Sequence, residues 1–181
     1  MDAKIEKKEG RRITIQIDIE LCDKMLDTEE AIQRGLNEAG LLATEYALSE
    51  FDTDGTPIEV ANKKYTSKGK ISKTYQCPYG EINLARHIYQ SNLGGSTYCP
   101  LDKDARILVY STPKFAKMVS QKYSETGSKE VQRDLRENHN RNISRTYIQQ
   151  ISNAVGTVAL TKPWKYTTGV AMRMFQVLAS V

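Results

Sequence analysis

The sequence predicts an α+β protein, with a long helix and a small antiparallel sheet followed by three shorter helices. Three observations carry this prediction. Apolar residues recur at helical spacing over about 28–50, β-branched and aromatic residues punctuated by glycine fill about 56–99, and helical spacing returns over 111–160. We expect an N-terminal α+β domain over 1–110, a helix-turn-helix module over 111–160 and an aberrant tail over 161–181.

A strand is expected to precede the long helix. Four isoleucines alternate with polar residues from Ile13 to Ile19, which is the period of a half-buried strand. The sequence leaves open whether this strand pairs with the later hairpins or lies apart from them. Thr28 is expected to be the N-cap of the long helix, with a hydrophobic staple between Leu26 and Ile32. The helix is expected to reach about Glu50.

An acidic turn and a set of hairpins should follow that helix. Asp52, Asp54 and Gly55 lack the further ligands of a calcium loop, so an Asx turn with a left-handed glycine is favoured. A short strand is predicted at 58–60, and a hairpin with its turn at Pro78–Gly80. Lysines on the exposed face of this sheet could follow a DNA backbone or protect a sheet edge, and the sequence leaves both alternatives open.

The three C-terminal helices are read from their apolar faces and their breaks. Gly127 and Ser128 separate the first helix from the second, and Ser144 is expected to cap the third. The apolar positions expected to face a common core are Phe115, Met118, Val119 and Tyr123, then Val131 and Leu135, then Ile148, Ile151, Val155 and Val158.

The opposite face of the third helix is polar and rich in amides. It holds Arg145, Thr146, Gln149, Gln150, Ser152 and Asn153. Gln and Asn can pair with adenine, and Arg with guanine, in the major groove of DNA. This predicts a helix-turn-helix with 145–158 as recognition helix, in which Arg145, Thr146, Gln149, Gln150 and Asn153 meet bases and Arg141 in the turn meets a phosphate. The alternative is a helical module that packs against a partner protein.

The charge distribution favours the nucleic-acid interpretation. Residues 111–181 contain eleven Lys and Arg against four Asp and Glu, whereas residues 1–110 contain fifteen against eighteen. The net charges are therefore +7 and −3, which together give the +4 of the whole chain. Positive charge concentrated around a proposed reading helix is what neutralisation of phosphates requires.

Several other classes of function lack support in the sequence. No apolar run reaches the roughly 20 residues that cross a bilayer, and the charged N-terminus lacks a signal-peptide core, so a cytoplasmic protein associated with the nucleoid and not with a membrane is expected. The three cysteines are expected to be reduced, and Cys77, His87 and Cys99 lack the paired spacing of zinc ligands. We expect no catalytic residue, metal or cofactor site in this chain.

Residues 75–123 contain the strings PYG, RHIYQS, GG and YCPLD, and residues 131–160 add an NH-R-IS-YIQ run. Together with FDTDGTPIEVANKKYTS at 51–67, these residues resemble the N-terminal region of bacterial insertion-sequence transposases of the ISKra group, over about 25–165. The resemblance implies a DNA-binding module. In that family a following ribonuclease-H-like domain supplies the Asp, Asp and Glu that hold two divalent metal ions such as Mg²⁺.

The sequence departs from that family after Tyr166. The final TTGVAMRMFQVLASV does not resemble the family's continuation, as expected of a chain truncated or frameshifted before the catalytic domain. Such a product would bind double-stranded DNA and not cut it alone, with a full-length transposase or a second copy as further partners. Two alternatives are a competitor that regulates transposition or transcription, and a protein-interaction module that does not bind DNA.

Overall fold

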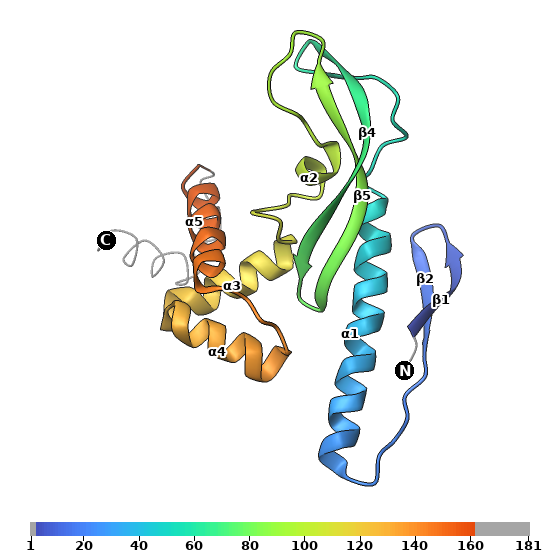
Figure 1. The fold of residues 1–181 in the computed structure, drawn as a ribbon, viewed down its shortest axis with the longest axis vertical. Helices are drawn as coiled ribbons and strands as arrows, with labels where there is room; N and C mark the ends of the chain where they lie inside the picture. The colour runs from blue at the N-terminus through green and yellow to red at the C-terminus, as the bar shows by residue number, and fades with distance from the viewer. Residues whose placement is uncertain (1–2, 162–181) are drawn as a thin grey trace. The chain divides into compact units, whose positions relative to one another are not determined.

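The computed structural model describes residues 3–161 and divides into two compact units, one ending at Ala105 and the other beginning at Arg106 (Figure 1). The predicted α+β class with small antiparallel sheets is confirmed, and the described residues form five helices. The fold-class prediction, which lists the long helix first, is wrong in that order because two strands precede the helix, of which the isoleucine pattern predicts only β2. The tail expected over 161–181 lies outside the described residues, apart from the helical Thr161.

A two-stranded hairpin opens the first unit. Strands β1 (Ala3–Glu9) and β2 (Arg12–Ile17) pair antiparallel in a sheet of their own, with Gly10 at φ 57° in the turn. The isoleucine strand therefore lies apart from the later hairpins, which settles the alternative that the sequence leaves open. The sequence pattern does not predict strand β1, because most of its residues are charged and exposed. Its pairing with β2, rather than its own pattern, makes it a strand.

Helix α1 (Met25–Ser49) begins three residues before the predicted cap and ends where expected. Thr28 is not the N-cap. Its hydroxyl lies inside the first turn, where it accepts a hydrogen bond from the Cys22 N–H and donates one to the Cys22 carbonyl, both 3.0 Å long. Thr28 therefore fastens the incoming loop to the helix, and Leu26 is 67% exposed instead of forming the expected staple.

Two glycines let neighbouring chain approach α1 closely. A Cβ atom at Gly35 would lie 3.0 Å from the Ile17 side chain, and one at Gly40 would lie 2.4 Å from the Tyr79 ring. The β1–β2 hairpin thus covers one side of α1, as Figure 1 shows. The predicted apolar face is not a buried core face. Ile32, Ala39 and Ala43 are half-buried, and Leu36 is 52% exposed.

The second sheet has three antiparallel strands in the order β3 (Ile58–Val60), β4 (Lys63–Cys77) and β5 (Gly80–Ser91). The predicted strand at 58–60 and the hairpin turn at Pro78–Gly80 are confirmed. Strand β4 carries a bulge between Ser67 and Lys70, where Gly69 has φ 92°. Beyond β5, Tyr98 returns to pair with Tyr89.

A buried polar cluster joins the short helix α2 (Pro100–Asp104) to this sheet. The Asp102 carboxylate accepts hydrogen bonds from the Tyr75 hydroxyl at 2.5 Å and from the Arg86 guanidinium at 3.4 and 3.5 Å. Burial, and then the Asp102 contact, raise the pKa of the Tyr75 hydroxyl well above its usual range. Burial alone would lower the pKa of Arg86, but Asp102 outweighs it and the pKa is raised. Arg86 is therefore a buried, charged partner of Asp102.

The second unit consists of α3 (Pro113–Thr126), α4 (Ser128–His139) and α5 (Arg145–Thr161). Gly127, at φ 86°, separates the first two helices as predicted. The predicted apolar faces meet in one core, whose buried members are Phe115, Ala116, Val119, Val131, Leu135, Ile143, Ile148 and Ile151. Met118, Tyr123 and Val155 pack against this core while partly buried, and Val158 is 42% exposed.

Candidate nucleic-acid interface

The turn between α4 and α5 is fixed by hydrogen bonds at both of its ends. Asn140 adopts the left-handed conformation that ends α4, and the Arg141 N–H donates to the Leu135 carbonyl at 2.8 Å. The Asn140 N–H donates to the same Leu135 carbonyl, so that two amides of the turn close the end of α4. The Gln132 side chain donates to the Ile143 carbonyl, also at 2.8 Å, so that α4 holds the turn from the side. The turn therefore has one defined path into α5.

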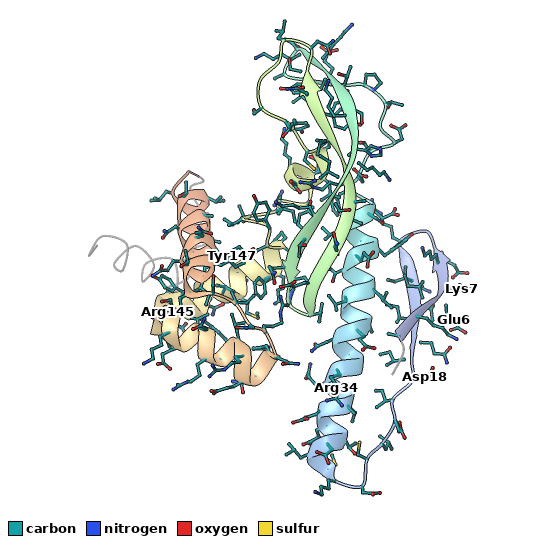
Figure 2. The ribbon with its side chains drawn as sticks, viewed as in Figure 1. Glu6, Lys7, Asp18, Arg34, Arg145 and Tyr147 are labelled. Carbon is teal, nitrogen blue, oxygen red and sulfur yellow. The ribbon has the colours of Figure 1, made fainter. Side chains whose placement is uncertain are left out.

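The start of α5 is anchored by Ser144 and Tyr147. The Ser144 hydroxyl accepts a hydrogen bond from the Tyr147 N–H at 3.2 Å, which confirms the predicted N-cap. The Tyr147 hydroxyl is hydrogen-bonded to the Ser111 hydroxyl at 2.9 Å and to the Val109 carbonyl. Figure 2 labels Tyr147 and Arg145 in this first turn. The orientation of α5 about its axis is thus set at its first turn as well as by its core.

The core side of α5 includes one residue that the sequence analysis assigned to the outward face. Ile148 and Ile151 are fully buried, as predicted. Ser152 is only 2% exposed, and its hydroxyl donates to the Ile148 carbonyl at 2.9 Å. The outward assignment of Ser152 is wrong because position 152 is four residues from Ile148 and therefore lies on the same side of the helix.

The remaining predicted side chains of α5 lie together on its exposed face. Arg145, Thr146, Gln149, Gln150 and Asn153 are all exposed. Within residues 3–161, no hydrogen bond involves the side chains of Thr146, Gln149, Gln150 or Asn153. We call these five residues the α5 amide face. Its amides each offer a donor and an acceptor to a ligand, and α5 contains no Asp or Glu that would repel an anion.

Arg145 lies at the N-terminal end of the α5 amide face. Its Nε donates to the Ser128 hydroxyl, the first residue of α4, at 3.3 Å. This contact draws the guanidinium toward the start of α4 while the residue stays exposed. Arg145 is therefore an exposed cation whose guanidinium is held in one direction, whereas the ammonium group of a flexible surface lysine is not.

Arg141 does not lie on this face. It is only 6% exposed, and its guanidinium lies 5.2 Å from the centre of the Phe115 ring. The structure thus does not bring Arg141 to the surface from which we expected it to contact a phosphate. The sequence could not indicate this burial, because a long arginine stem can either cross a core or reach into solvent from a turn.

We therefore expect Arg141→Ala to act mainly on stability. Loss of the ring contact and of the buried stem should lower the free energy of unfolding of the second unit by about 1–2 kcal/mol. Urea unfolding followed by circular dichroism measures the change. The control is Arg136→Ala, whose side chain is 65% exposed and which should stay within about 0.5 kcal/mol of wild type. Equal effects of the two substitutions would contradict the burial argument.

Acidic residues neutralise some cations of the second unit and leave others unpaired. Over residues 106–161, ion pairs of a Lys or Arg join Lys122 to Asp134, Arg133 to Glu130 and Arg136 to Glu137. Hydrogen bonds from Lys122 and then Asn138 lower the pKa of Asp134, so this acid stays ionised. Among the described residues, the exposed cations of this unit with no acid within ion-pair distance are Arg106, Lys114, Lys117, Lys129 and Arg145.

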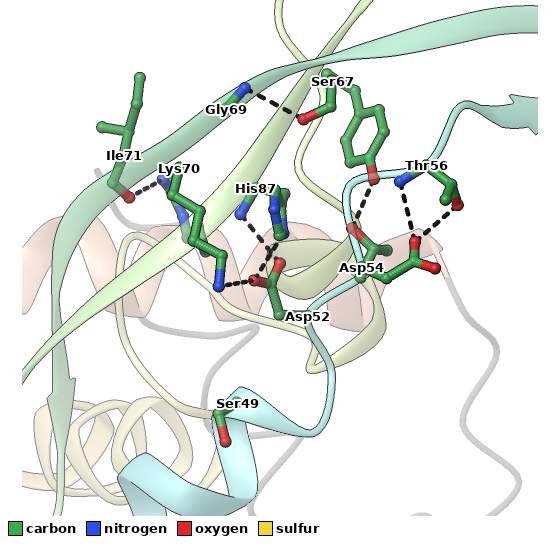
Figure 3. Close-up of polar contacts among 12 residues, drawn as sticks. Ser49, Asp52, Asp54, Thr56, Ser67, Gly69, Lys70, Ile71 and His87 are labelled. Atoms are coloured by element: carbon green, nitrogen blue, oxygen red, sulfur yellow. Dashed lines mark hydrogen bonds and ion pairs between the residues drawn. The ribbon is translucent and has the colours of Figure 1, made fainter.

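A second polar cluster lies in the first unit and fastens a loop (Figure 3). The Asp52 carboxylate accepts hydrogen bonds from the His87 N–H and from His87 Nδ1, both at 3.0 Å, and lies 4.0 Å from Lys70 Nζ. The Asp54 carboxylate accepts from the Thr56 N–H and hydroxyl, which confirms the predicted Asx turn. These contacts attach the loop after α1 to β4 and β5, and we assign them a structural role.

The described part of the chain contains no group of three His, Cys, Asp or Glu side chains that could hold a metal ion. Between residues 3 and 161, no helix has the length and apolar character needed to cross a bilayer. Over residues 106–161 the second unit has a core of three helices, and the last of them has an exposed amide-rich face and no acidic residue. No protein-family model, curated protein or solved structure matches the chain.

Proposed function

We propose that this protein binds double-stranded DNA through α4 and α5 used as a helix-turn-helix, with α5 in the major groove. The observation that carries the proposal is the α5 amide face, which is exposed and has no acidic neighbour on its helix, and whose Thr146, Gln149, Gln150 and Asn153 side chains form no hydrogen bond within the described residues. The 17 residues of α5 give a helix of about 26 Å, which is long enough to lie along a groove.

The chemistry of the side chains indicates which of them would contact bases and which would contact phosphates. Gln149, Gln150 and Asn153 would contact base edges, because their amides can pair with adenine through two hydrogen bonds. Arg145 can pair with guanine or reach a phosphate. The unpaired lysines of α3 and α4 would contact phosphates, which fix the position of the protein without reading sequence.

The wider proposal is that the chain is the DNA-binding N-terminal part of a transposase of the ISKra group. It rests on the sequence strings of residues 51–160 and on the DNA-binding surface proposed for the second unit. Cytoplasmic residence at the nucleoid belongs to the same proposal, as do a full-length transposase or a second copy of the chain as protein partners. In this proposal the chain recognises insertion-element DNA.

The test is a salt titration of binding to a labelled duplex, measured by fluorescence anisotropy. If all five unpaired cations of the second unit reach phosphates, they should contribute about −4.5 to the slope of the logarithm of the association constant against the logarithm of salt concentration, and any further phosphate contact would steepen it. A slope near zero, or no binding at about 0.1 M salt, would refute the proposed function. A selection from random duplexes would then give the preferred sequence.

A further inference from the structure

Strand β4 has an uneven charge distribution that the α5 amide face does not use. Five lysines occur between Lys63 and Lys73, and no Asp or Glu occurs from Ala61 to Gly80. Lys63, Lys64 and Lys68 are exposed, and among the described residues none of the three has an acid within ion-pair distance. We call these three residues the β4 lysine cluster.

Protection of an open sheet edge does not account for the whole cluster. Lysines often guard an unpaired edge strand against aggregation. Lys68 fits this explanation, because β3 pairs with β4 only as far as Tyr65. Lys63 and Lys64 do not fit it, because β3 covers this edge of β4 where they lie: they pair with Val60 and Glu59. Glu59 is the nearest acid in the ladder, and it forms no ion pair with Lys64.

The β1–β2 hairpin also carries cations, and two of them have partners. Lys7 pairs with Glu9 at 2.7 Å, and Lys8 Nζ lies 4.5 Å from the centre of the Tyr46 ring. Lys7 is labelled in Figure 2 on this hairpin. In the β4 lysine cluster, by contrast, no residue has an ion pair or an aromatic ring contact among the described residues.

The cluster lies at the start of β4 and at its bulge. Lys63 and Lys64 are the first two residues of the strand, and Lys68 lies in the bulge between Ser67 and Lys70. With no acid from Ala61 to Gly80, these three exposed ammonium groups form a stretch of uncompensated positive charge. Such a stretch suits a polyanion, whose phosphates the lysines can neutralise.

We propose that the β4 lysine cluster is a second contact surface for the phosphate backbone of duplex DNA, separate from the α5 amide face. This inference rests on the proposed function. The second unit contributes nine Lys and Arg against four Asp and Glu over residues 106–161, so a duplex is a ligand to which both units can supply cations. The cluster adds affinity that depends on salt and does not depend on base sequence.

The test compares two triple variants of the full chain that each remove three positive charges. Lys63→Gln/Lys64→Gln/Lys68→Gln removes the cluster, and Lys7→Gln/Lys8→Gln/Arg11→Gln is the control at the other hairpin. We expect the β4 variant to lower the salt slope by roughly three and to weaken binding to random and preferred duplexes alike, by about ten-fold or more at about 0.1 M salt. The control should change the slope by less than about one.

Distinct outcomes separate failure of this inference from failure of the proposed function. If wild type binds duplex DNA but the two triple variants behave alike, the cluster is not a DNA contact and the proposed function stands. If wild type binds no duplex, both fail. If the β4 variant binds DNA as wild type does but loses binding to anionic phospholipid vesicles, the cluster contacts lipid instead. Thermal melts should match wild type for both variants, because all the substituted side chains are exposed.

Discussion

Replacing Gln149 and Asn153 together by alanine is expected to weaken binding to the preferred sequence by about 2–6 kcal/mol, while binding to a random duplex changes little. Each amide that pairs through two hydrogen bonds with a base contributes about 1–3 kcal/mol of discrimination. Phosphate contacts, which supply non-specific affinity, remain in place. Competition between the two duplexes, followed by fluorescence anisotropy, measures the ratio of affinities directly.

The chain offers a closely matched control for that experiment. Gln33 and Asn37 in α1 have the same residue types at the same spacing of four, and the Gln33 amide donates to the Asn37 side chain at 3.1 Å. Gln33→Ala/Asn37→Ala should leave both affinities unchanged, because these amides already bond to each other. Equal losses on the two duplexes for the α5 variant would mean that its amides do not read bases.

Asp102→Ala is expected to destabilise the first unit by about 2–4 kcal/mol. The substitution leaves the Arg86 guanidinium, whose side chain is 9% exposed, without its carboxylate, and it removes the acceptor of the Tyr75 hydroxyl. An uncompensated buried charge is costlier than the loss of a surface ion pair. Hydrogen exchange of the β4 and β5 amides, read in the full chain, should report the loss locally.

The control for this prediction lies two residues away in the same helix. Asp104 is exposed and, among the described residues, has no ion pair. Asp104→Ala should therefore change stability by less than about 0.5 kcal/mol. If the two substitutions have similar effects, the Tyr75–Asp102–Arg86 cluster contributes little to the stability of the first unit.

Periodicity was sufficient to locate most elements of this fold. The spacing of Phe115, Val119 and Ile148 marked the core faces of α3 and α5, and the glycine and proline turns marked the later hairpin. Local chemistry also placed the Ser144 cap and the Asx turn at Asp54. These features depend on residues close together in the sequence, which is why the sequence alone could indicate them.

Features that depend on tertiary partners were harder to predict. Strand β1 is a strand because β2 pairs with it, and Arg141 is buried because Phe115 offers a ring surface. The inward position of Ser152 could have been found, since it falls within the helical repeat of Ile148 and Val155. The Asp102 contacts could not, because Tyr75 and Arg86 are 27 and 16 residues away from it in the chain.

The uncovered apolar side of α1 affects how any salt titration of this protein must be carried out. Met25 and Leu36 are 66% and 52% exposed, so α1 presents hydrocarbon to water while β4 presents ammonium groups. Strongly excluded salts such as sulfate favour burial of hydrocarbon, whereas all salts screen charge. Raising sulfate would thus drive copies of the protein together at the same time as it releases them from DNA. The titration should therefore use a chloride salt. Light scattering at each concentration shows whether the protein associates with itself, so that self-association can be told from release of DNA.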